Sequence, residues 1–401
     1  MRTAITLCGV VGICAAAAVP AAADGGYIFL EGDATALAQT RQEVVIAFYR
    51  DGAGDAAVDK AVYVLRSRYT GAPPQSFVWL VPVPATPTDV VAHQNGTLFE
   101  RLDDLTAPHF FIDTGTSQPA MCGCAANAPG DGNLAGGLVV VAAQGQAGIF
   151  DWAALTSTGA DALLDWLNAN SFAVPDTAVD VLQTYIDQEL HFLAIRVAAF
   201  DELAADEDGE IAIPPIQFTC ATSRRFYPMV ISQISAAEET EVLIYLLADH
   251  RIEAANVPNA VIDEEALAAD NDSPSLTNYE QLFTDAIAAE GGLALVTEYA
   301  QHWYGETAWV TAPPAVLELE YLTRLRTVLT PQRMTQDFEF QDAPTDETVY
   351  SVYWIEGTEV AGVVAALGTP AALLLVYVGF HTTMKHRRSA RRTRHPQSVA
   401  A

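Results

Sequence analysis

The stretch QEVVIAFYRDGAGDAAVDKAVYVLRSRYT, residues 42–70, has the composition of two strands separated by a turn. Its two ends, residues 42–50 and 61–70, are rich in β-branched and aromatic side chains, which favour strands. Between them, residues 51–55 alternate Asp, Gly and Ala, which is typical of a turn. The stretch therefore predicts two antiparallel strands joined by a short connection.

Further strands are expected on either side of this hairpin. Residues 76–84 (SFVWLVPVP) predict a third strand, and Pro82 and Pro84 indicate that it ends at a sheet edge or an exit, because proline has no N–H to donate. Runs of β-branched and apolar residues predict the remaining strands at 137–151, 191–200, 211–219, 225–234, 240–248 and 291–299.

Helices are predicted between these strands from apolar side chains spaced by three or four residues. In the first helix, over 96–105, Leu98, Leu102 and Leu105 share one face. Four more helices are expected, around Leu163–Leu167, around Val179–Ile186, at 277–289 and at 315–329. Helices and strands are mixed rather than alternating, so we expect an α+β fold with mixed, mainly antiparallel sheets and flanking helices.

The N-terminus has the layout of an export signal. Arg2 is followed by an apolar run to residue 19, Pro20 ends that run, and Ala21–Ala23 offers small residues for cleavage before Asp24. Residues 1–23 are therefore predicted to be a signal peptide. The alternative is an uncleaved N-terminal anchor.

The C-terminus has the pattern of a membrane anchor. Residues 360–380 contain no charged side chain, and their length suits the hydrocarbon core of a bilayer. Tyr353 and Trp354 precede this run, as aromatics do at membrane interfaces. The basic tail that follows, residues 381–401, favours the cytoplasmic side. We therefore predict a transmembrane helix at 359–380, with the N-terminus outside the cytoplasm and a cytoplasmic C-terminus.

The region between these ends, residues 24–358, is strongly acidic. From Asp24 to Glu359 the chain holds all 50 acidic residues and only 13 of the 20 basic residues, which gives this stretch a net charge of −37. Such a surface repels nucleic acid, so nucleic-acid binding is excluded. The region is long enough for two subdomains, 24–136 and 137–345.

Three cysteines remain after removal of the signal: Cys122, Cys124 and Cys220. Disulfides are the usual state of cysteine pairs in exported proteins. Because a bridge within Cys122-Gly123-Cys124 would be strained, we expect Cys220 to pair with Cys122 or Cys124, leaving one thiol free.

The extracytoplasmic region resembles the bacterial family known as domain of unknown function 2330 over about residues 27–345. The most specific part is the strand Phe77–Pro84, which ends in Pro-Val-Pro. The resemblance also rests on Leu98–Leu102 with Thr106–Pro108, Trp166–Asn168 through Pro175, Leu246–Arg251 and Val296–Tyr299. The resemblance implies an exported, frequently membrane-anchored bacterial protein, here at the inner membrane, and it implies no activity. Similar proteins often carry cysteines directly after the signal, whereas this chain begins its mature part with Asp24-Gly25-Gly26-Tyr27.

No familiar catalytic, phosphate-binding or metal-binding motif occurs in the sequence, so no catalytic residue, metal or cofactor is predicted. The most notable polar cluster consists of the consecutive residues Asp249, His250 and Arg251. We expect Asp249 and Arg251 to form a structural ion pair there.

Two functions are compatible with this layout. The first is a binding or scaffolding module of the bacterial cell envelope, held by a single membrane pass, with an unidentified envelope protein as a further partner. A variant of it treats the C-terminal segment as a sorting signal that is later removed. The second is a membrane-tethered enzyme that uses Cys220 as nucleophile and His250 as base.

Overall fold

The structure is a computed structural model that describes residues 26–30, 38–71, 77–93, 96–112, 139–174, 178–197, 203–206, 209–269, 277–303 and 313–355. Every described residue lies in one compact unit. The predicted signal peptide, transmembrane helix and cytoplasmic tail lie outside the described residues. Among the described residues, no helix is long and apolar enough to cross a membrane.

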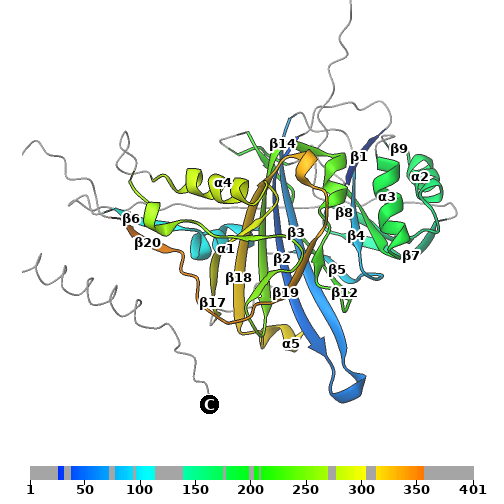
Figure 1. Ribbon diagram of the computed structural model, residues 1–401. Coiled ribbons are helices and arrows are strands. Elements are labelled where there is room, and N and C mark those ends of the chain that lie inside the picture. Colours follow the sequence, from blue (N-terminus) through cyan, green and yellow to red (C-terminus); the bar gives the residue numbers. More distant parts are fainter. Residues whose placement is uncertain are drawn as a thin grey trace, which may run out of the picture. The chain divides into compact units, whose positions relative to one another are not determined.

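The larger sheet contains the predicted hairpin at its centre (Figure 1). Strands β2 (Ala38–Asp51) and β3 (Val58–Thr70) pair antiparallel along their whole length, so that prediction is confirmed. β14 (Ala236–Ala248) lies parallel to β2 on its other side. The strand order in this sheet is β16-β17-β18-β14-β2-β3-β12-β5, and β11 (Ile211–Ala212) also pairs with β3. The bounds of the other strands are β16 Asn259–Ala260, β17 Leu295–His302, β18 Tyr321–Leu329, β12 Ile216–Ala221 and β5 Thr88–Ala92.

A second sheet has six antiparallel strands in the order β7-β8-β10-β4-β1-β9. Their bounds are β7 Val140–Ala147, β8 Phe150–Thr156, β10 His191–Val197, β4 Phe77–Val83, β1 Gly26–Leu30 and β9 Phe172–Ala173. The Pro-Val-Pro strand β4 is thus internal rather than an edge. Among the described residues, β1 pairs with β4 only from Phe77 to Leu80, and Pro82 pairs only with Phe192 of β10.

The two sheets pack face to face around one large core. Alternate side chains of β2, such as Val44 and Ile46, meet alternate side chains of β4 and β10, such as Trp79 and Leu193. Side chains from both sheets fill the space between them, as in other packed sheets. Both sheets draw strands from either side of residue 136.

Helices cover the outer face of each sheet, as Figure 1 shows. α2 (Ala160–Ala169) and α3 (Ala178–Asp187) cover the six-stranded sheet through side chains such as Trp166 and Leu182. α1 (Leu98–Thr106), α4 (Tyr279–Ala289) and α5 (Pro314–Leu317) cover the nine-stranded sheet. The α+β prediction is confirmed as a sheet-dominated fold with antiparallel and parallel pairs.

The face of the nine-stranded sheet under α1 and α4 carries ion pairs as well as apolar residues. Arg66 on β3 contacts Glu43 on β2, and Arg324 on β18 contacts Glu298 on β17. Acids from the helices complete the pairs: Glu100 and Asp103 come from α1 and Glu280 from α4. The scarce arginines of this acidic chain therefore hold the helices onto the sheet.

Other predictions of local structure were also wrong. Residues 315–329 form the short helix α5 and then the strand β18, not one helix. Residues 225–234 form the two-residue strand β13 (Phe226–Tyr227) and the 3-10 helix η3 (Val230–Ile234). In α1, Leu105 is exposed and Phe99 is buried instead.

Candidate functional site

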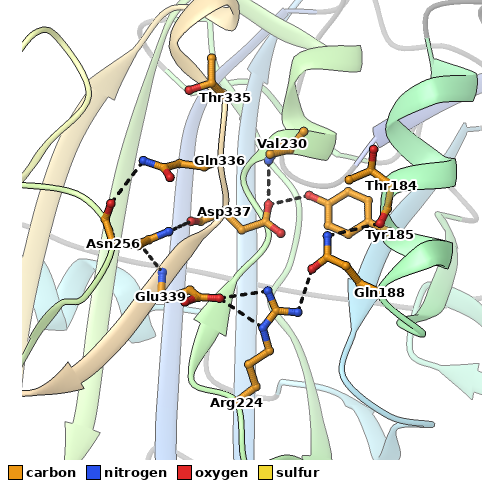
Figure 2. A pocket seen from close by; sticks show the side chains of 10 residues that line it. All are labelled: Thr184, Tyr185, Gln188, Arg224, Val230, Asn256, Thr335, Gln336, Asp337 and Glu339. Atoms are coloured by element: carbon orange, nitrogen blue, oxygen red, sulfur yellow. Dashed lines mark hydrogen bonds and ion pairs between the residues drawn. The ribbon is translucent and has the colours of Figure 1, made fainter.

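A pocket of about 260 Å³ opens between the helical layer of the six-stranded sheet and a small three-stranded sheet (Figure 2). The small sheet consists of β13, β19 (Phe338–Asp342) and β15 (Ile252–Ala254). Mostly polar residues line the pocket: Thr184, Tyr185, Gln188, Arg224, Val230, Asn256, Thr335, Gln336, Asp337 and Glu339. They come from segments more than 150 residues apart, so only folding brings them together.

Asp337 is the central charged group of the pocket, and its side chain is fixed by its surroundings. The residue is only 9% exposed. Its Oδ1 accepts hydrogen bonds from the Tyr185 hydroxyl at 2.6 Å and from the backbone N–H groups of Met229 at 2.8 Å and Val230 at 3.0 Å. The Tyr185 oxygen in turn accepts from the N–H of Ile231 at 3.0 Å. Asp337 thus ties the start of η3 to α3.

The second carboxylate oxygen of Asp337 has a different role. The three hydrogen bonds from Tyr185, Met229 and Val230 all end on Oδ1. Oδ2 points toward the space between Arg224 and Tyr185 in Figure 2. Burial raises the pKa of Asp337, and the three donors to Oδ1 oppose that rise. Oδ2 is therefore a prearranged hydrogen-bond acceptor in a partly dehydrated setting.

Arg224 forms one wall of the pocket and is held on three sides. Its Nη2 and Nε donate to Glu339 Oε1 at 3.0 and 3.4 Å, and its Nη1 donates to Gln188 Oε1 at 2.9 Å. Its guanidinium lies 4.7 Å from the ring centroid of Phe226. Because Arg224 and Glu339 neutralise each other, Asp337 leaves the pocket with a negative charge when it is ionised.

Asn256 fixes the opposite wall. Its amide donates to the Asp337 carbonyl at 2.7 Å and its side-chain oxygen accepts from the Glu339 N–H at 2.9 Å. The Gln336 amide also donates to the Asn256 carbonyl at 3.4 Å. Side-chain positions around Asp337 are therefore set before any ligand enters.

The predicted polar cluster lies elsewhere, on the surface at the end of β14. His250 is exposed, and its Nδ1 lies 3.0 Å from Asp346 Oδ2, which raises the pKa of His250. The Arg251 N–H donates to Asp346 Oδ1 at 2.9 Å and its guanidinium to the Glu347 carbonyl at 3.1 Å. The expected ion pair between Asp249 and Arg251 is not formed, because Asp346 is the partner of this turn.

Cys220 and His250 are not brought together. Two strands separate them, since Leu247 near the end of β14 aligns with β2, then β3, then Thr219 on β12. Three steps across a sheet span about 14 Å. The Cys220 thiol is buried and, among the described residues, unbridged, and it donates to the Ala85 carbonyl at 3.6 Å. Cys122 and Cys124 lie outside the described residues, so the bridge stays a prediction.

Burial raises the pKa of the Cys220 thiol to about 12, and this predicts an unreactive thiol. In the native protein at pH 8, Cys220 is expected to resist alkylation by iodoacetamide and to label once the chain is unfolded in urea. Mass-spectrometric mapping of alkylated peptides measures this. Rapid labelling of Cys220 in the native state would contradict the buried position. Labelling in urea that requires a reductant would instead establish a bridge to Cys122 or Cys124.

The pocket residues were missed by the sequence analysis. Asp337 and Glu339 flank the start of a strand in the sequence QDFEFQD, residues 336–342, which matches no binding motif. No group of three or more metal-ligating side chains is gathered anywhere in the described part of the chain. The arrangement suits hydrogen bonding and charge recognition.

Comparison with known protein families gives a match over most of the chain. A family model described as an uncharacterized protein conserved in bacteria (DUF2330) matches residues 19–341. No curated protein matches the chain.

Proposed function

Since the chain belongs to the bacterial family DUF2330, we propose that it is a binding module of the bacterial cell envelope, tethered to the inner membrane by one C-terminal pass. The ends of the sequence support the tether, because a signal-like start precedes a charge-free run and a basic tail. In this arrangement the folded acidic body lies outside the cytoplasm.

One observation carries the binding function: Asp337 presents a fixed carboxylate oxygen to a small polar pocket. A group so buried is costly to desolvate, and a ligand that donates a hydrogen bond or a positive charge offsets that cost. The net charge of −37 also attracts cations toward the pocket. We therefore propose a small polar ligand that carries an amine.

The cysteine-dependent alternative has less support. Its nucleophile is buried and bonded to a backbone carbonyl, and its base is paired with Asp346 on the surface. A nucleophile and its base need to lie within hydrogen-bond reach of each other. Neither side chain lines the pocket at Asp337.

The variant Asp337→Asn tests the binding proposal. Asparagine keeps an oxygen for the three donors that hold Oδ1 but removes the negative charge, so the fold is preserved. The probes are ethanolamine, glucosamine and spermidine, with glucose and glucuronate as uncharged and anionic comparisons. At least one amine is expected to raise the melting temperature of the full chain, and Asp337→Asn is expected to bind it at least about tenfold more weakly.

Asp249→Asn is the matched control, because Asp249 is an exposed carboxylate outside the pocket. It removes the same charge and is expected to leave amine binding unchanged. The proposal fails if no amine shifts the melting temperature of the wild-type protein. It also fails if Asp337→Asn and Asp249→Asn respond alike in calorimetric titration.

A further inference from the structure

Two exposed aromatic rings lie side by side on a small ribbon apart from the main sheets. β6 (His109–Ile112) and β20 (Val352–Ile355) pair in parallel, as Figure 1 shows, although more than 200 residues separate them in sequence. The register places Phe111 opposite Trp354, and their ring centroids are 4.8 Å apart. We call these two strands the aromatic ribbon.

The inner face of the aromatic ribbon is apolar, and its outer face carries aromatic and apolar side chains beside the exposed His109. On the inner face, Phe110 and Tyr353 pack against Tyr279 of α4 at centroid distances of 5.2 and 6.0 Å. On the outer face, Phe111 is 50% exposed and Trp354 is 68% exposed, and Val352, opposite His109, is also exposed. Because helix α4 already anchors the inner face, the outer face is free to contact another surface.

The chain itself indicates what that surface is. β20 ends at Ile355, and the charge-free run begins at Val360. Five residues span at most about 18 Å when fully extended. If residues 360–380 cross the bilayer, the outer face of the aromatic ribbon cannot lie far from the headgroup layer, where tryptophan is enriched.

We propose that Phe111 and Trp354 seat the folded body on the outer surface of the lipid bilayer, which fixes its orientation there. This inference rests on the proposed membrane tether. The favoured lipid is zwitterionic, because the net charge of −37 between Asp24 and Glu359 repels anionic headgroups. The body then contacts the bilayer at two sites, the tether and Phe111, which is distant from it in sequence.

Phe111 supplies the test, because its place near the membrane follows only from its pairing with Trp354. The variant Phe111→Trp is made in a Trp354→Phe background of the full chain and reconstituted in phosphatidylcholine vesicles that carry bromine near the headgroup. We expect the added tryptophan to lose fluorescence relative to unbrominated vesicles, since interfacial side chains reach the start of the acyl chains.

Val140→Trp in the same background is the matched control. Val140 is an exposed apolar residue at the start of β7, which lies on the opposite side of the molecule from the aromatic ribbon in Figure 1. Its tryptophan is expected to keep its fluorescence in brominated vesicles. Equal quenching at residues 111 and 140 would overturn the inference.

The outcomes separate this inference from the membrane tether. If the protein fails to float with the vesicles, the tether proposal itself is wrong. If the protein floats but residue 111 is not quenched, only the seating is wrong. An unquenched tryptophan at 111 with blue-shifted emission in both vesicles and detergent would mean that protein, from this chain or a second copy, covers the ribbon.

Discussion

Replacing Arg324 with alanine is expected to lower the free energy of unfolding by about 3–5 kcal/mol, because it removes the donor to Oε2 of the buried Glu298 carboxylate, whose Oε1 keeps Tyr279 and Arg326. The Arg324 side chain is 4% exposed and that of Glu298 is fully buried. Nε donates to Glu298 at 2.8 Å, while Nη1 donates to Asp103 of α1 at 2.6 Å and to the Tyr245 hydroxyl at 3.2 Å. The substitution thus also removes one of the ion pairs that hold α1 on the sheet, while the pair of Glu100 with Arg66 remains.

Urea unfolding of the full chain in detergent, followed by tryptophan fluorescence, measures the effect. Arg50→Ala is the matched control, since Arg50 and Asp59 form an exposed pair at 3.9 Å that is expected to contribute less than about 1 kcal/mol. Arg324→Lys is expected to fall between the two, because one ammonium cannot replace the divergent guanidinium donors. Equal stabilities for Arg324→Ala and Arg50→Ala would show that the ion pairs of Arg324 with Glu298 and Asp103 do not stabilise the fold.

Replacing Trp79 with alanine is expected to lower the free energy of unfolding by roughly 3–5 kcal/mol, because it opens a cavity between the two sheets. This loss is independent of the one expected for Arg324→Ala. Trp79 is fully buried on the internal strand β4 and belongs to the core that joins the sheets. Neighbouring strands hold the backbone on both sides, at Tyr27 and Ile195, so the surroundings cannot collapse easily into the space.

Two variants calibrate this expectation in the same unfolding experiment. Trp79→Phe keeps an aromatic ring at the site and is expected to lose less stability. Trp354→Ala removes the same side-chain type from an exposed position and is expected to change stability by no more than about 0.5 kcal/mol. A loss for Trp354→Ala as large as that for Trp79→Ala would mean that burial does not set the effect.

β18 shows why one strand was mistaken for a helix. Leu322, Leu325 and Leu329 repeat at spacings of three and four residues, which is the pattern of a helix face. In the sheet, Leu325 and Leu329 join the core between the sheets, whereas Arg324 and Arg326 point to the opposite face. An arginine buried against acids from other strands is indistinguishable, in the sequence, from an arginine in solvent.

The candidate site was hidden for a related reason. Asp337 holds η3 through backbone N–H groups more than 100 residues earlier in the chain. A strand was therefore predicted at 225–234, where the local residues are β-branched but the distant carboxylate stabilises a 3-10 turn. No periodicity within either segment reports such a contact.

The family of the chain and the elements that local contacts stabilise can be predicted from the amino-acid sequence. These elements are the hairpin of β2 and β3 and the helices α2, α3 and α4. Their sequences show the pattern of their own structure, because side chains on one face recur every two residues in a strand and every three to four residues in a helix. Three further features are visible only in the folded chain. β4 pairs in the six-stranded sheet rather than beside the hairpin, arginines lie buried under helices, and Phe111 contacts Trp354. Strand partners and charge pairs are chosen by contacts between distant segments, and the local sequence pattern of a segment does not specify its partner.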